Sequence, residues 1–197
     1  RRLATLTEQL KRGIEECDGL LSNNEMFLAR TKGIGTINGE DALDFGMTGP
    51  SLRASGILED VRISEPYSIY ERFNFGIPVG TAGDCYDRYY VRVEEMRQSL
   101  SIIEQAVQQM EEGPILANVR RITRPPKGEV YIRTESPRGD FGVYLVSDGS
   151  DKPYRVKVRA PSFANLQTLQ HLLREAYVAD SVVILGSIDI VLGEVDR

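Results

Sequence analysis

The sequence predicts an α+β fold, with a helical core of long antiparallel helices and a small antiparallel β-meander. Apolar residues recur at helical spacing over residues 3–21 and 84–112. Three further runs, at 129–135, 141–146 and 154–159, have the composition of strands and are separated by turn-forming residues. With 197 residues, the chain is long enough to bury a substantial core in one ordinary domain.

The two long helices are predicted from their apolar positions. The first is amphipathic, with charged residues between Leu3, Leu6, Leu10, Ile14, Cys17 and Leu21. The second is the clearest helix in the sequence, because its apolar residues alternate steps of three and four: Tyr89, Val93, Met96, Leu100, Ile103, Val107 and Met110. We expect Asp84 to cap its start and Gly113-Pro114 to end it.

Three regions are expected along the chain. Residues 1–113 form a helical region with glycine-rich loops, including one short helix near 40–45. Residues 114–160 contain a basic connector and the β-meander, with a hairpin turn at Arg138-Gly139-Asp140. Residues 161–197 form a helix capped by Ser162, then a buried strand and a buried terminal tail. In the last strand of the meander, we expect one buried face and one basic face.

Composition excludes several classes of protein. A formal charge of −5 and a pI near 5.1 provide no basic field that would attract nucleic acid. The longest apolar stretch, 181–195, is too short for a membrane span and contains Asp189 and Glu194. The chain begins at Arg1 with no initiator Met and no secretory signal, so we expect a fragment or a piece of a subunit.

Few residues could carry chemistry of their own. Two distant cysteines and one histidine make a metal site in this chain improbable. Gly33-Ile34-Gly35 lacks the third glycine of a dinucleotide fingerprint, so no nucleotide is expected there. His171 could donate a proton, but a surface or hydrogen-bonded helix histidine is favoured because it lies among leucines.

The carboxy-terminal run is the strongest candidate site. Asp189, Glu194, Asp196 and Arg197 follow a segment apolar enough to be buried. Because buried charges need partners, these groups form either a structural salt-bridge cluster or the lining of a polar cavity. The residues alone leave both readings open.

Several stretches occur in the order found in one family. Residues 48–56, 83–88, 126–131, 153–163 and 193–197 resemble the hydrogenase-like D subunit of NADH-quinone oxidoreductases (respiratory complex I), in its carboxy-terminal part. The resemblance covers nearly the whole chain. One departure is that the segment between Gly113-Pro114 and Pro126-Lys127 is shorter than in family members.

This family in turn resembles the large subunit of nickel–iron hydrogenases, which implies the same fold. Residues 135–139 have a close counterpart there, and the hydrogenase terminus reads Asp-Pro-Cys-x-x-Cys-x-x-His. Asp189 is kept in this chain, but Val191 and Glu194 occupy the cysteine positions and Arg197 the histidine position. Because nickel needs soft thiolates, the resemblance implies that the metal site is lost and a cavity remains.

The resemblance also implies a function. The cavity would admit quinone between this subunit and a neighbour that carries the terminal iron–sulfur cluster, with Asp189, Val191, Glu194 and Arg197 beside it. NADH, flavin and the iron–sulfur clusters would belong to partner subunits, and electron transfer would be coupled to proton translocation. The family's quinone-headgroup His and Tyr lie in the amino-terminal half, so His171 does not inherit that role.

The implied location is peripheral, on the cytoplasmic face of a bacterial inner membrane or the matrix side in mitochondria. Two alternatives remain. A hydrogenase large subunit would need four cysteines, which the chain lacks. A non-catalytic structural or assembly module of a hydrogenase-related redox complex would share the fold without a quinone cavity.

Overall fold

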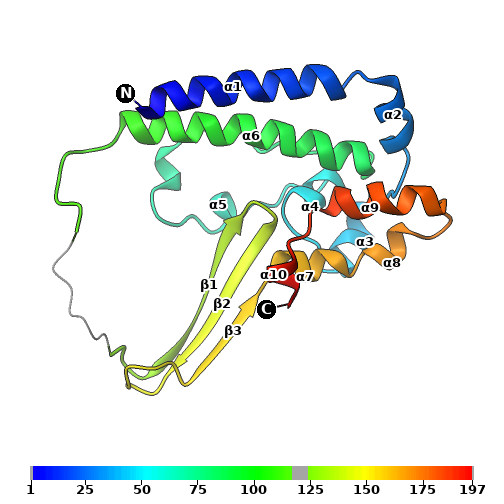
Figure 1. The fold of residues 1–197 in the computed structure, drawn as a ribbon. Coiled ribbons are helices and arrows are strands. Elements are labelled where there is room, and N and C mark those ends of the chain that lie inside the picture. Colours follow the sequence, from blue (N-terminus) through cyan, green and yellow to red (C-terminus); the bar gives the residue numbers. More distant parts are fainter. Residues whose placement is uncertain (1, 117–123, 197) are drawn as a thin grey trace.

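A computed structural model describes residues 2–116 and 124–196 of the chain, as a body of helices from which a three-stranded sheet extends (Figure 1). The helical elements of the first half are α1 (Arg2–Leu21), α2 (Glu25–Thr31), α3 (Gly39–Asp44), α4 (Pro50–Ala54), α5 (Val61–Ser64), the 3-10 turn η1 (Tyr70–Arg72) and α6 (Cys85–Gln108). The remaining elements are β1 (Gly128–Ser136), β2 (Gly139–Ser147), β3 (Arg155–Arg159), α7 (Pro161–Leu166), α8 (Leu169–Leu172), η2 (Val178–Asp180), α9 (Ser181–Ile188) and α10 (Leu192–Asp196). The α+β class is confirmed.

Helices α1 and α6 lie side by side and antiparallel, as predicted (Figure 1). Ion pairs join them at successive levels, with Lys11 Nζ 2.5 Å from Glu104 Oε1 and Arg97 Nη2 2.6 Å from Asp18 Oδ2. The apolar stripe of α1 is only partly covered, because Leu3, Leu6 and Leu10 remain exposed. These two helices therefore form one outer layer of the body.

The start of α6 matches the prediction, and its end does not. The Asp84 side chain accepts a hydrogen bond from the Asp87 amide at 2.8 Å, which confirms the expected cap. The helix ends at Gln108, ahead of Gly113, so the predicted extension to Glu112 is wrong. Met110 is 71% exposed, so another turn would gain no apolar packing among the described residues.

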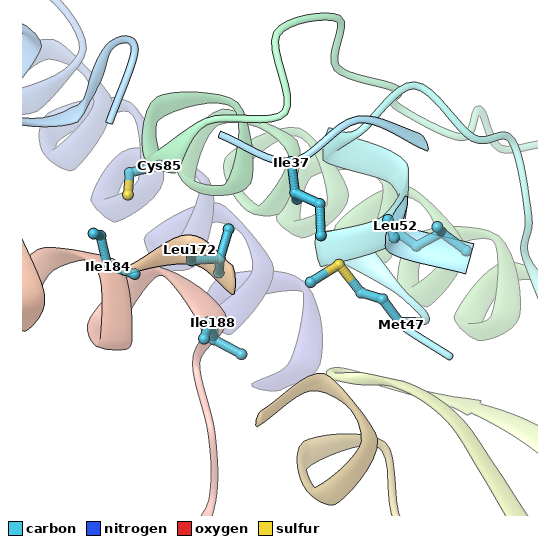
Figure 2. Packing of buried hydrophobic residues seen from close by; sticks show 8 residues of the cluster. Ile37, Met47, Leu52, Cys85, Leu172, Ile184 and Ile188 are labelled. Carbon is cyan, nitrogen blue, oxygen red and sulfur yellow. The ribbon is translucent and has the colours of Figure 1, made fainter. Parts of the chain in front are cut away.

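The core lies where α3, α4, α6, α8 and α9 meet. Its largest buried members come from five separate segments of the chain (Figure 2): Ile37, Met47, Leu52, Cys85, Leu172, Ile184 and Ile188. The short helix predicted near 40–45 is confirmed as α3, and α4 follows it within the glycine-rich region. These short helices bring the glycine-rich turns against α6 and α9.

The three strands pair in the order β1-β2-β3, which confirms the antiparallel meander. Ser136 pairs with Gly139, so the hairpin turn consists of Pro137 and Arg138. A turn is confirmed here, but Gly139 and Asp140, which were predicted within it, belong to β2. The prediction of a buried face on β3 is wrong, because Tyr154 and Val156 are exposed. The reason is visible in Figure 1, where the sheet extends away from the helices and only its near end meets α7.

The segment after the sheet differs most from expectation. Two short helices, α7 and α8, replace the single predicted helix. Ala160 occupies the cap position of α7, and Ser162 lies inside the helix, so the predicted Ser162 cap is wrong. Residues 182–185, predicted as a buried strand, belong to α9, where Ile184 and Ile188 are buried one turn apart and Val182 is exposed.

The terminal tail is also corrected. Leu192 in α10 is exposed, and no residue of this helix is buried, so the prediction of a buried tail is wrong. Arg197 lies outside the described residues, as does much of the predicted connector, at 117–123.

Candidate functional site

Asp189 ends α9 and is held between two guanidinium groups. Its backbone is left-handed, with a φ of 57°, which turns the chain sharply out of the helix. Arg138 Nε donates a hydrogen bond to the Asp189 carbonyl oxygen at 2.9 Å, and Arg138 Nη2 lies 3.4 Å from Oδ1. Arg92 Nε lies 3.8 Å from Oδ2 on the other side. Arg138 therefore holds the Asp189 backbone, and the partly exposed Asp189 carboxylate lies between two guanidinium groups.

Arg92 joins α6 to the last turn of α9. Its Nη1 donates to the Ser187 carbonyl at 2.8 Å, and its Nη2 donates to the Ile188 carbonyl at 3.1 Å. Burial lowers the pKa of Arg92 to about 10, and the Asp189 carboxylate opposes this shift. At neutral pH the guanidinium remains charged, so Arg92 both anchors the end of α9 and balances Asp189.

A cavity of about 450 Å³ lies beside Asp189, between α2, α6 and α9. Most of its wall is apolar or aromatic, from Phe27, Cys85, Tyr89, Val93, Met96, Val183 and Gly186. The polar side chains in the lining are Thr31, Arg92, Ser187 and Asp189. An apolar pocket with a few placed polar groups is the usual form of a small-molecule site in proteins.

Val191 and Glu194 are held by α7 and do not line this cavity. Glu194 Oε2 accepts hydrogen bonds from the Ser162 amide, at 3.2 Å, and from the Ser162 hydroxyl. The same hydroxyl oxygen accepts from the Val191 amide at 3.2 Å. The structure thus brings Asp189 to a cavity and places Val191 and Glu194 at a contact between α7 and the terminal segment. Arg197, the fourth predicted residue, lies outside the described residues.

A second group of charges anchors the sheet close to this site. Arg53 is 1% exposed and donates from Nε to Glu95 at 2.7 Å and from Nη2 to Glu135 at 2.9 Å. Asp60 lies 3.7 Å from Arg53 Nη1 and also pairs with Arg62. Burial raises the pKa of Glu135, while Arg53 opposes that rise. This cluster joins α4, α5 and α6 to β1, just ahead of the turn that carries Arg138.

Several of these residues were missed by reasoning from the sequence. Arg138 was interpreted only as part of a hairpin turn and Ser162 only as a cap. Nothing in the sequence indicated that Arg92 belongs to the site, because a basic residue on a helix is normally solvent-exposed. The similarity of residues 135–139 to hydrogenases is the one signal that could have drawn attention to Arg138. His171 lies on α8 with its ring edge against Phe45, at a centroid distance of 5.5 Å.

Two properties of the described residues bear on the class of site. Within 2–116 and 124–196, no three His, Cys, Asp or Glu side chains are grouped so that they could hold a metal ion. None of the helices in those ranges is both long and apolar enough to cross a membrane.

Comparison with known proteins identifies the family. The model of the family described as "Respiratory-chain NADH dehydrogenase, 49 Kd subunit" matches residues 1–127 and 119–197. Proteins named as the D subunit of NADH-quinone oxidoreductase are similar over most of the chain. The one from Desulforamulus reducens is 51% identical over 195 residues, which is 99% of this chain and 53% of the relative.

Two further relatives agree with that match. The D subunit of Carboxydothermus hydrogenoformans is 53% identical over 93% of this chain and 50% of its own length. That of Clostridium beijerinckii is 47% identical over 99% of this chain and 53% of its own length. The chain spans about half the length of these relatives. By family match and by identity, the chain belongs to the family of the 49 Kd subunit of respiratory-chain NADH dehydrogenase, which includes the curated D subunits of NADH-quinone oxidoreductases.

Proposed function

We propose that this chain helps to form the quinone-reduction cavity in the peripheral arm of an NADH-quinone oxidoreductase. The observation that carries the proposal is the placement of Asp189, which lines a largely apolar cavity of about 450 Å³ and whose carboxylate lies near Arg138 and Arg92. The relatives' printed names supply the reaction, in which NADH is the donor and a quinone the acceptor.

The chemistry of the reaction agrees with such a site. A quinone becomes a quinol by taking up two electrons and two protons, so its site needs an apolar space for the ring and a few ionisable groups nearby. Phe27, Tyr89 and Met96 provide an apolar and aromatic wall. Asp189 provides an ionisable carboxylate that lies beside the positively charged Arg92. In this proposal the chain binds and orients the quinone.

The electrons come from elsewhere in the complex. A neighbouring subunit with the terminal iron–sulfur cluster delivers them, and flavin and further clusters in other subunits take them from NADH. Electron transfer at the quinone is coupled to proton translocation by the whole complex. We assign Val191, Glu194 and Arg197 to the same site in this proposal; Val191 and Glu194 are held by Ser162 and do not line the cavity described here.

Fold and location follow from the same proposal. The chain shares the fold of the nickel–iron hydrogenase large subunit, with Val191 and Glu194 where that enzyme has thiolates. The complex holds it at the cytoplasmic face of a bacterial inner membrane, or on the matrix side in a mitochondrion. A non-catalytic assembly role is the competing function, and a pair of activity measurements separates the two.

The test is a paired assay on the assembled complex that carries Asp189→Asn in the full-length form of this subunit. We expect NADH:quinone reductase activity to fall, because the carboxylate charge between Arg92 and Arg138 is lost. NADH oxidation by an artificial acceptor such as ferricyanide should stay normal, since it occurs at the distant flavin. Asp151→Asn, in an exposed loop, is the matched control and should change neither activity.

Two outcomes would contradict the proposal. If both activities fell together in a fully assembled complex, Asp189 would serve assembly or stability. If neither changed, the terminal run would be ordinary packing and the assembly role would be favoured.

A further inference from the structure

One buried amide holds together two turns that are distant in the sequence. Asn165 on α7 is 1% exposed. Its Oδ1 accepts a hydrogen bond from the Thr48 amide at 3.0 Å, while its Nδ2 donates to the carbonyl oxygens of Arg138, at 3.1 Å, and Thr48, at 3.4 Å. The glycine-rich turn at Thr48 and the hairpin turn at Arg138 are therefore both fastened to α7 by the same side chain.

The two turns touch through their backbones. A Cβ atom added to Gly49 would lie 2.3 Å from Gly139 Cα, and one added to Gly139 would lie 2.6 Å from Thr48 Oγ1. The Asp140 amide also donates to Thr48 Oγ1 at 3.2 Å. Because no side chain separates the turns, the backbone of Arg138 cannot shift without moving the Thr48 turn as well.

The side chain of Arg138 connects its fixed backbone to Asp189. Its Nε holds the Asp189 carbonyl and its Nη2 faces the Asp189 carboxylate. Ser162, which precedes Asn165 by one helical turn on α7, holds Val191 and Glu194. The short helix α7 thus supports residues 189–194 at two points, directly through Ser162 and indirectly through Asn165 and Arg138.

We propose that Asn165 is a positioning residue for the quinone site: its amide sets the place of the Arg138 turn, and thereby the place of the Asp189 carboxylate at the cavity. Asn165 does not line the cavity, so its effect on quinone passes through Arg138. This inference rests on the proposed function.

The test uses the assembled complex with Asn165→Ala in the full-length form of this subunit. We expect the KM for a short-chain ubiquinone to rise roughly tenfold, which corresponds to about 1.4 kcal/mol of lost binding free energy. The turnover number at saturating quinone should change much less, and ferricyanide reduction should be unchanged.

The matched control is Gln105→Ala. Gln105 makes the same kind of link, because its amide accepts from the Asn74 amide and donates to the Asn74 carbonyl, both at 2.8 Å. It joins a loop to α6 and has no contact with the Arg138 turn. We expect this variant to leave the quinone KM unchanged; an equal rise in both variants would mark a general loss of rigidity and overturn the proposal.

A double-mutant cycle shows whether the effect passes through Arg138. If it does, Asn165→Ala should add little to the rise in quinone KM that Arg138→Gln already causes. Fully additive effects in that cycle would overturn the inference.

If Asn165→Ala prevents assembly, Thr48→Val is the second variant. It removes only the hydroxyl contact to Asp140 and should raise the quinone KM by a smaller factor. An unchanged KM in that assembled variant would equally overturn it.

The same set of variants separates this inference from the proposed function. If Arg138→Gln and Asp189→Asn leave quinone kinetics unchanged in an assembled complex, the proposed function itself fails. If those two alter quinone kinetics and Asn165→Ala does not, only the positioning role is wrong.

Discussion

Arg53 and Glu135 form a buried ion pair across the base of the sheet, with Nη2 2.9 Å from Oε1. The first prediction concerns Arg53→Met, which leaves Glu135, Glu95 and Asp60 without their shared cation. Breaking a buried ion pair by removing one partner costs about 3–5 kcal/mol. We expect a loss of that size in the free energy of unfolding of this chain, measured by urea denaturation.

A surface ion pair provides the control for that prediction. Lys11 and Glu104 join α1 to α6 with both side chains substantially exposed. Lys11→Met should change the free energy of unfolding only slightly, because exposed ion pairs contribute little to stability. Equal losses of unfolding free energy in the two variants would show that burial does not make the Arg53 ion pairs more stabilising than a surface pair.

The second prediction is a pH dependence. Because burial raises the pKa of Glu135, the folded state holds its proton more tightly than the unfolded state does. The stability that Glu135 contributes is therefore fully present below its unfolded pKa, about 4.3, and is lost as the pH rises through the folded value. In Glu135→Gln this loss should be absent. Urea denaturation from pH 4 to 7 should show wild type losing stability relative to the variant, and a gain instead would mean that Arg53 outweighs burial.

The third prediction concerns the terminal run. Val191→Met lengthens a side chain that is 37% exposed, next to the backbone contact with Ser162. In the assembled complex we expect altered quinone or inhibitor affinity, measured by inhibitor titration of NADH:quinone activity, with normal ferricyanide reduction. Unchanged titration curves would remove Val191 from the proposed site.

The fourth prediction compares two glycines. Gly139→Ala places a Cβ within 3 Å of Thr48 and Gly49 at a φ of +128°, so the free energy of unfolding should fall by about 3 kcal/mol. Gly13→Ala, in α1 with nothing within 4 Å, should raise it by about 1 kcal/mol. Denaturation midpoints that moved in the same direction would contradict the close contact of the two turns.

Long periodic segments were predictable, and short apolar ones were not. Helices α1 and α6 repeat their apolar pattern over several turns, which only a helix accommodates, and the strands were marked by turn residues on both sides. Residues 182–185 are four apolar residues in a row, which suit a buried strand and a helix equally well. The spacing of four between Ile184 and Ile188 was the one sign of a helix.

Only part of the candidate site was predictable, because the sequence indicates residues but not the distant side chains that contact them. Similarity to a known family pointed to Asp189, but the partners that hold it come from elsewhere in the chain. Arg138 lies 51 residues away, and local patterns carry no information about such contacts. Likewise, nothing near Asn165 in the sequence indicates that its amide meets Thr48.

The contact of Asn165 with the two turns has a consequence for how the protein folds. The hydrogen bond from the Thr48 amide to Asn165 spans 117 residues, and the one from the Asp140 amide to the Thr48 hydroxyl spans 92. Closing such long loops is entropically unfavourable until other contacts have formed, so this junction belongs to the late steps of folding. At ordinary rates of synthesis, on the order of 10 seconds pass between the addition of Thr48 and the addition of Asn165 to the chain. Throughout that interval the glycine-rich turn lacks its hydrogen bonds to Asn165 and is open to competing contacts.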